Sequence, residues 1–312
     1  MNEFEAIDRM AALLPERPDD VLVSIGDDCA VFRIGEERWV AAADMLVSGR
    51  HFLPAADPED VGYKAVAVNV SDAAAMGARP RFVLTSAAAP NSETALACFR
   101  GVAAACREFG VYPLGGDTTG SDALVVDVAI LGVLDGEPVL RSGARAGDLI
   151  AVTGELGASE AGLLALTEGI GGFERLKERH RRPEPRLEAG LVAARSGAGA
   201  MIDLSDGLAS DLRHICRASG VGATVHLERL PLADDTRKLA SLLRREPEQL
   251  AATGGEDFEL LVTGSEAALK RIERASGIPV TPIGEVTVGD DVAFLLNGER
   301  IEGLSGWDHF ET

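Results

Sequence analysis

The sequence predicts a protein of the α/β (α+β) class that is built from two domains. Its 312 residues, 46% hydrophobic and 26% charged, have an ordinary globular composition but exceed the length of a typical single domain. Apolar runs typical of strands alternate with helical patterns in both halves. Gly, Pro and Arg interrupt this alternation between residues 137 and 147. We therefore expect an N-terminal domain over residues 1–140 and a C-terminal α/β domain over residues 141–312.

The first half mixes strands and helices. We expect a helix over residues 3–14 and strands over 21–25 and 38–43. Asp57 and Pro58 suit the N-cap and first turn of a long helix, "DPEDVGYKAVAVNVSDAAAMGA". The chain then predicts a strand in "RFVLTSAAAP", an Ala-rich helix over 92–109, and strands in "VYPLGGD" and "ALVVDVAILGVLDG".

The second half opens with a strand, a Gly-rich turn and a helix in "SGARAGDLIAVTGELGASEAGLLAL". Further elements are predicted in this order: basic helices interrupted by Pro over 173–195, a strand and a helix over 200–219, strands near 222–228 and 258–263, a helix over 265–275, and strands near 280–296.

The charge of the chain limits its partners. The 50 acidic and 30 basic residues give a formal net charge of −20, which disfavours nucleic acid and anionic membrane surfaces. No apolar run approaches about 18 residues, and the N-terminus is acidic where a signal peptide would be positively charged. We therefore expect a cytoplasmic protein that binds neither nucleic acid nor membrane. Its 4 cysteines form no CxxC pair and are expected to be reduced thiols in the core.

Carboxylates follow apolar runs at several points of the chain. In "MIDLSDGLASDL", Asp203, Asp206 and Asp211 surround one strand-to-helix junction, where helix capping is the simpler explanation. The same pattern recurs, however, in "VSIGDDCAVF", "VAAADMLVSGRHF", "VAVNVSDAAAMG", "YPLGGDTTG" and "TGGEDFELL". Because the ends of adjacent strands meet at one edge of a sheet, we expect these junctions to converge.

Converging carboxylates would repel one another by roughly 3 kcal/mol per pair at about 5 Å and an effective dielectric of about 20. Divalent cations remove this repulsion, and Mg²⁺ completes its octahedron with substrate phosphates. The pattern therefore predicts phosphate chemistry with several Mg²⁺ ions. The chain contains no GxxxxGK[ST], no GxGxxG after a strand and no HRD or DFG, so the familiar nucleotide-binding folds are disfavoured.

Taken together, the motifs resemble a known family. They are "IGDDCAVF", "ADMLVSGRHF", "GYKAVAVNVSDAAAMGARP", "LGGDTTG", "RSGARAGDLIAVTG", "MIDLSDGLASDL", "GGEDFELL" and "GWDHF", and they span residues 25 to 310 in order. As a set they are similar to thiamine-monophosphate kinases, of the superfamily of aminoimidazole ribonucleotide synthetase. The resemblance implies that superfamily's two-domain fold, with an N-terminal domain that forms a dimer-spanning β-barrel with flanking helices. It also implies ATP-dependent phosphorylation of thiamine monophosphate to thiamine diphosphate by a homodimer.

The resemblance also implies roles for individual residues, matched motif by motif. It implies Mg²⁺ ligands at Asp28, Asp44, Asp72, Asp117, Asp203 and Asp206, of which Asp206 and Asp117 would be catalytic. It implies ATP contacts at Gly116, Asp117, Arg141 and Ser205. It implies contacts to thiamine monophosphate at His51, Glu256 and Trp307. From the residues alone, Arg141 could equally lie in an exposed turn and Trp307 could be a core anchor.

One departure from the family keeps alternatives open. The family carries hydroxyl residues before the Asp of "ADMLV", and this chain has Ala42 and Ala43, which removes two side-chain oxygens from the expected metal site. Ser48 and Arg50 also replace an acidic and an apolar residue. The alternatives are a sister ATP-dependent ligase or synthetase of the same fold, and a non-catalytic dimer that binds Mg²⁺ and nucleotide.

Overall fold

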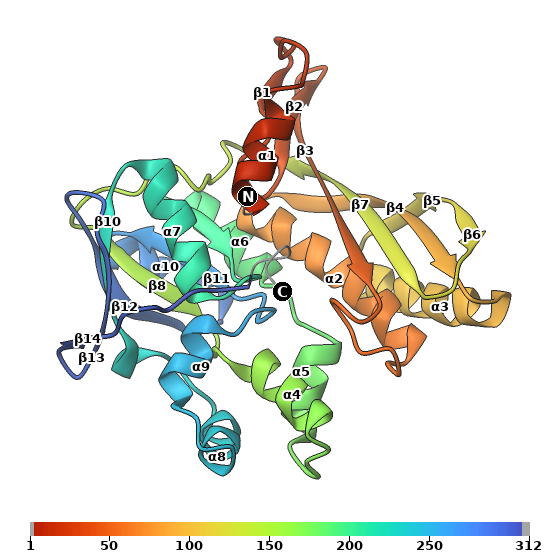
Figure 1. Cartoon of the computed structure of the whole chain (residues 1–312). Coiled ribbons are helices and arrows are strands. Elements are labelled where there is room, and N and C mark those ends of the chain that lie inside the picture. Colours follow the sequence, from red (N-terminus) through yellow and green to blue (C-terminus); the bar gives the residue numbers. More distant parts are fainter. Residues whose placement is uncertain (1–2, 308–312) are drawn as a thin grey trace.

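Two β-sheets, one from each half of the chain, lie on either side of the long helix α2, Pro58–Ala75 (Figure 1). The computed structural model describes residues 3–307, so residues 308–310 of the "GWDHF" motif lie outside the described part. Within that part, no helix combines the length and the apolar character that a membrane span requires.

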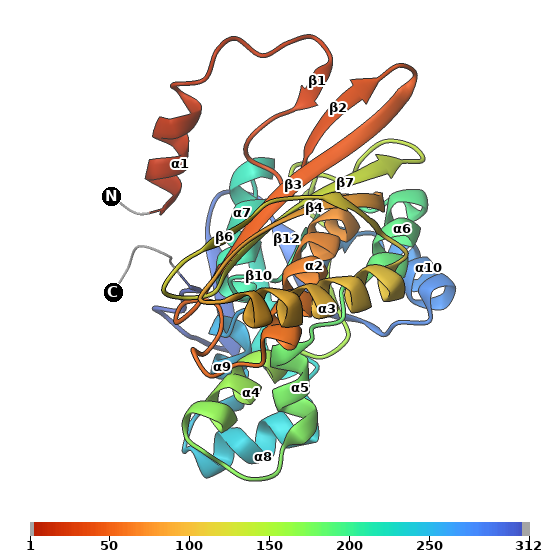
Figure 2. The same cartoon turned by 90° about the vertical axis from the view of Figure 1, so that its right-hand side faces the viewer.

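The first sheet has 7 strands in the order β1-β2-β3-β7-β4-β5, with β6 paired to β4. Its central strands β3, β7 and β4 pair antiparallel, and helices α2 and α3 cover one face (Figure 2). The elements of this half are α1 (Glu3–Ala11), β1 (Val21–Val23), β2 (Ala30–Ile34), β3 (Glu37–Val47), β4 (Arg79–Ala89), α3 (Ser92–Phe109), β5 (Tyr112–Gly115), β6 (Thr118–Gly120) and β7 (Val125–Leu134).

The second sheet has 7 strands in the order β14-β13-β10-β12-β8-β11-β9. Its strands are β8 (Leu149–Thr153), β9 (Met201–Asp203), β10 (Gly222–His226), β11 (Leu260–Gly264), β12 (Val280–Thr287), β13 (Val292–Leu296) and β14 (Glu299–Arg300). Its helices are α4 (Ala158–Thr167), α5 (Glu174–Arg181), α6 (Leu187–Ser196), α7 (Leu208–Ser219), the 3₁₀ helix η1 (Leu227–Arg229), α8 (Asp234–Leu242), α9 (Pro247–Thr253) and α10 (Glu266–Ser276).

Helix α2 begins as the sequence predicts, because the Asp57 side chain accepts a hydrogen bond from the Glu59 backbone N–H and Pro58 fills the first turn. It packs on α3 at very short range through two glycines. A Cβ at Gly62 would lie 1.9 Å from the Cys98 carbonyl oxygen, and one at Gly101 would lie 1.8 Å from the Glu59 carbonyl oxygen. The two helix backbones therefore touch, which only glycine permits.

The C-terminal end of α2 belongs to the second half as well. Ala75 lies in one apolar cluster with Ala151, Ala189 and Met201. A Cβ at Gly190 of α6 would lie 2.0 Å from the Ala74 carbonyl oxygen. Helix α2 is therefore buried on almost all sides, which explains why its sequence is apolar rather than amphipathic.

The other face of the first sheet is apolar and open. The side chains of Trp39 and Phe82 stack there with ring centroids 6.2 Å apart. Met45, Leu84 and Tyr112 are 53%, 43% and 67% exposed. Among the described residues the sheet ends at β1 and β5 and is not a closed barrel.

The predicted long helices and most strands are confirmed, and the four cysteines are buried free thiols. Some predictions were wrong. The strand expected over 38–43 runs from Glu37 to Val47, so Asp44 lies inside β3 and not in a turn after it. Asp72 lies inside α2, as the predicted helix requires, and not at a strand end, as its grouping with the other junctions suggested. Strand β2 and helices α8 and α9 were missed.

Candidate functional site

A cleft of about 860 Å³ lies between the two halves of the chain. Strand β3, helix α2 and the turn before β2 contribute its N-terminal wall. The segment from the end of β9 into α7, the "GGEDF" segment and the chain around Trp307 contribute the C-terminal wall. The walls are strongly acidic, because carboxylates from both halves face the same space.

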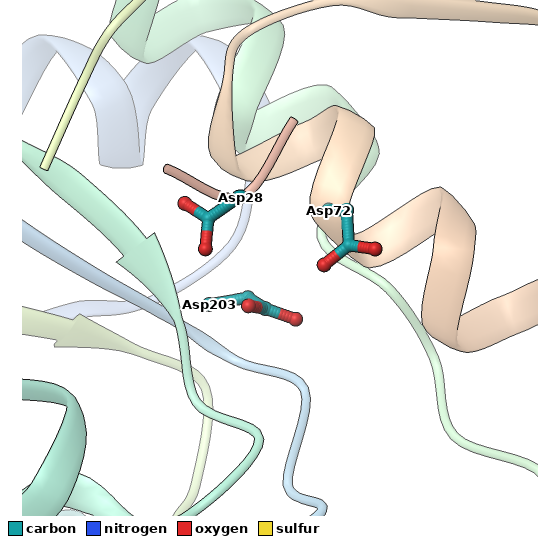
Figure 3. Close-up of side chains that lie close together, drawn as sticks. All are labelled: Asp28, Asp72 and Asp203. Carbon is teal, nitrogen blue, oxygen red and sulfur yellow. The ribbon is translucent and has the colours of Figure 1, made fainter. Parts of the chain in front are cut away.

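Three of these carboxylates come together from distant parts of the sequence. One side-chain oxygen from each of Asp28, Asp72 and Asp203 lies within 4.8 Å of the others. Asp28 lies in the turn before β2, Asp72 in α2 and Asp203 at the end of β9, and the three side chains lie close together (Figure 3). The Oδ2 atoms of Asp28 and Asp203 are buried and accept no hydrogen bond from the described residues. Such oxygens fit a hard divalent cation such as Mg²⁺.

The pKa values of the three aspartates are raised by burial, and those of Asp72 and Asp203 also by neighbouring carboxylates. Burial, together with the charge of Asp28, raises the pKa of Asp203 to about 8. Burial raises the pKa of Asp72 well above its ordinary value, and the charges of Asp44 and Asp203 raise it further. Burial also raises the pKa of Asp28. The protein therefore compensates the charge of the cluster only in part, which suits a metal-binding site.

Arg141 supplies the cationic group nearest to the cluster. Its Nη2 lies 2.6 Å from Asp28 Oδ1, and its backbone N–H donates to Asp27. Its guanidinium is partly buried and lines the cleft, so it does not lie in an exposed turn. A guanidinium in this position can bind a phosphate oxygen.

The turn after β9 is organised by a further aspartate, Asp211. Its Oδ2 accepts hydrogen bonds from the backbone N–H groups of Asp206 and Gly207, so capping accounts for this carboxylate. Ser205 and Asp206 line the cleft. Trp307 lines it too, because its backbone N–H donates to the Asp206 carbonyl oxygen.

Glu256 lines the cleft from a segment with an unusual backbone conformation. Glu256 and Phe258 have φ values of +63° and +50°, which non-glycine residues rarely adopt. The neighbouring acidic residues hold this conformation. Asp257 accepts hydrogen bonds from the N–H groups of Gly157 and Ser159, and Glu259 is fully buried in a bidentate ion pair with Arg186. Such strain at a cleft is typical of functional sites.

Two residues beside Glu256 were not singled out from the sequence. Lys64 Nζ lies 2.7 Å from Glu256 Oε1, and His180 Nδ1 lies 3.4 Å from Glu256 Oε2. Lys64 also donates to the carbonyl oxygen of His51, whose Nδ1 accepts from the Val47 N–H. The signal in the sequence was a single lysine within the apolar run "VGYKAVAVNV".

The structure places Gly116 and Asp117 apart from the cleft. Both are exposed, and neither lines it. Leu46 of β3 pairs with Val126 of β7, Val126 with Ala87 of β4, and Ala87 with Thr118 of β6. Three strand spacings, or about 14 Å, therefore separate Asp117 from the cleft strand. A Cβ at Gly116 would lie 1.7 Å from the Thr85 carbonyl oxygen, so close packing alone explains why a glycine occupies this position.

Known proteins of similar sequence identify the family. The models "AIR synthase related protein, N-terminal domain" and "AIR synthase related protein, C-terminal domain" match residues 26–134 and 145–297. The thiamine-monophosphate kinase of Mycobacterium tuberculosis is 39% identical over 323 residues, which cover 99% of this chain and 92% of the relative. That of Escherichia coli K12 is 39% identical over 327 residues, which cover 99% and 98%. The chain belongs to the thiamine-monophosphate kinase family.

Solved structures agree with this membership. AaThiL complexed with AMPPCP and TMP superposes with a TM-score of 0.88 at 32% identity, covering 99% of this chain and 97% of that one. The thiamine monophosphate kinase of Aquifex aeolicus gives a TM-score of 0.81 at 30% identity, with 97% and 100% covered. The hydrogenase maturation protein HypE in its HypE–HypF complex shares the fold, with a TM-score of 0.74 at 20% identity.

Proposed function

We propose that this protein transfers the γ-phosphoryl group of ATP to thiamine monophosphate and so forms thiamine diphosphate, as a step of thiamine diphosphate biosynthesis. The observation that carries the proposal is the Asp28, Asp72 and Asp203 cluster in a cleft of about 860 Å³. Family membership at 39% identity selects the acceptor among phosphate substrates. We place the protein and its reaction in the cytoplasm.

The acidic residues hold Mg²⁺ in this proposal. Asp28, Asp72 and Asp203 are the primary ligands, and Asp44 and Asp206 line the same cleft as further ligands. Bound Mg²⁺ neutralises phosphate oxygens and so favours in-line phosphoryl transfer. Arg141 and Ser205 hold the nucleotide phosphates from the C-terminal wall.

The acceptor needs positioning rather than a general base. A phosphate monoester has a second pKa near about 6 and is largely dianionic at neutral pH. His51, Glu256 and Trp307 bind the acceptor and bring it into line with ATP, which is the main contribution a protein makes to this reaction. Trp307 offers an aromatic face to the cationic thiazolium ring.

The proposed active form is a homodimer. The open face of the first sheet carries Trp39, Met45, Phe82, Leu84 and Tyr112, an apolar surface of the kind that forms interfaces. Pairing two such sheets would give the dimer-spanning β-barrel that the family resemblance implies. It would also let Gly116 and Asp117 serve the cleft of the partner. Residues 1–140 and 141–312 are the proposed domains, in keeping with the two matched family models.

The decisive experiment measures ADP formation from ATP and Mg²⁺ with and without thiamine monophosphate. Turnover that needs the acceptor, falls by about 100-fold or more in Asp206→Asn and persists in Asp122→Asn supports the proposal, since Asp122 is an exposed loop residue. Absence of acceptor-dependent turnover over a range of Mg²⁺ concentrations refutes it. Mg²⁺-ATP binding without turnover would favour the non-catalytic dimer, consistent with Ala42 and Ala43 in the cleft wall.

A further inference from the structure

Lys64 is the largest fully buried side chain next to the cleft. It is 2% exposed and lies in α2, where most other buried residues are apolar. Its ammonium group contacts two residues from different halves of the chain. Nζ is 2.7 Å from Glu256 Oε1 and 3.1 Å from the carbonyl oxygen of His51.

Burying an ammonium group costs several kcal/mol unless its partners compensate. Core packing alone gives no reason for a lysine here, because an apolar residue such as methionine would fill the same volume without that cost. The partners, however, are two of the three residues that the proposed function assigns to the acceptor. The cation is therefore placed where it can set the geometry of acceptor binding.

Glu256 needs such support. Its backbone is in the left-handed region at φ +63°, and its side chain is 25% exposed at the cleft. Lys64 holds one carboxylate oxygen, and His180 lies 3.4 Å from the other. Burial and the charge of Lys64 lower the pKa of His180 to about 4, so this imidazole is neutral at pH 7 and Lys64 is the cation that pairs with Glu256.

We infer that Lys64 is a positioning residue for the acceptor: it fixes the Glu256 carboxylate and the turn that carries His51 in one arrangement across the two halves of the chain. The inference rests on the proposed function for the identity of the acceptor. Lys64 itself does not line the main cleft but a smaller side pocket of about 250 Å³. It therefore acts on the acceptor through Glu256 rather than by direct contact.

The test compares Lys64→Met and Lys64→Arg with the wild type, using steady-state kinetics and calorimetric titration with thiamine monophosphate. Lys64→Met should raise KM and Kd for thiamine monophosphate by about 10-fold or more and leave KM for ATP within about twofold. Lys64→Arg keeps the charge but cannot reproduce both contacts of a compact ammonium, so a smaller rise for the acceptor alone is expected. In a Glu256→Gln background, the additional effect of Lys64→Met should shrink, because the two residues act as a unit.

Lys177→Met is the matched control. Lys177 is 9% exposed and paired with Glu174 on α5, away from both pockets. Equal losses for ATP and acceptor in Lys64→Met, or the same change in Lys177→Met, would show a general packing defect and overturn the inference. If Lys64→Met does not fold, Lys64→Arg decides: an unchanged Kd for thiamine monophosphate overturns it. Wild-type protein without acceptor-dependent turnover would instead refute the proposed function. The two failures can be told apart, because calorimetry measures the binding of thiamine monophosphate independently of turnover.

Discussion

Single carboxylates determine the chemistry of the cleft. Asp28, Asp72 and Asp203 lie close enough to share a cation, and burial raises the pKa of all three. Arg141 pairs with Asp28, but the pKa values stay raised, so the charge of the cluster is only partly compensated and a metal or protons must supply the rest. The stability of the protein should consequently depend on divalent metal.

Saturating Mg²⁺ should raise the melting temperature by about 4 °C relative to EDTA, since a ligand at about 100 times its Kd contributes about 2.7 kcal/mol. Asp72→Asn removes an ionisable group that burial and the neighbouring carboxylates disfavour in its charged form, so it should raise the melting temperature in EDTA by about 2 °C and abolish most of the Mg²⁺ effect. Differential scanning fluorimetry measures both quantities, with Asp122→Asn as the exposed control. A full Mg²⁺ effect in Asp72→Asn would contradict the assigned ligand set.

His180 gives the stability a pH dependence of its own. Burial and the nearby Lys64 lower its pKa from 6.5 to about 4. Between these values the unfolded chain binds more protons than the folded protein, so the folded state loses stability as the pH falls. From pH 7 to pH 5 this residue should account for a loss of about 2 kcal/mol. Urea unfolding measures the free energy of unfolding at both pH values, and its decrease from pH 7 to pH 5 should be smaller by that amount in His180→Asn than in the wild type. An equal decrease in both proteins would be inconsistent with a buried neutral imidazole.

At the scale of elements, the packing of α2 on α3 places the cleft residues that α2 carries. Gly101 sits against the Glu59 carbonyl oxygen with no room for a methyl group. Gly101→Ala should lower the melting temperature by about 2–5 °C, because an overpacked contact costs about 1–3 kcal/mol and neither backbone can yield. Gly136→Ala, at an open bend, is the control and should change little. A neutral Gly101→Ala would mean that the helices separate easily.

The elements and part of the site could be predicted from the sequence, and the physical reasons differ. Helix α2 could be placed because Asp57 and Pro58 mark its start locally. The convergence of Asp28 with Asp203 was predicted, but the rule behind the prediction does not explain it, because Asp28 precedes a strand of the first sheet and Asp203 ends a strand of the second. The distance of Asp117 could not be predicted, because β6 pairs with β4 rather than with β3 and no local pattern specifies that neighbour. Lys64 was missed because its partner Glu256 lies 192 positions further along, beyond the reach of any periodicity.

For the whole molecule, the open face of the first sheet predicts association. Leu84→Asp places a charge in the centre of that face, beside Ala129 of β7, and should convert a dimer into a monomer. Size-exclusion chromatography with light scattering should give the wild type twice the mass of one chain. Leu242→Asp, on α8 at a position that is 61% exposed against 43% for Leu84, should remain a dimer. A wild-type monomer at micromolar concentration would contradict the proposed assembly.

Helix α2 also has a consequence for how the chain folds. Most of its apolar residues from Val61 to Ala73 belong to one apolar core, and Ala75 belongs to another. Lys64 also joins the helix to the second half through its ion pair with Glu256. Neither half can complete its interior without this helix. The polypeptide should therefore unfold in one cooperative transition, and a gene fragment encoding only the second half would yield an insoluble product rather than an autonomous module.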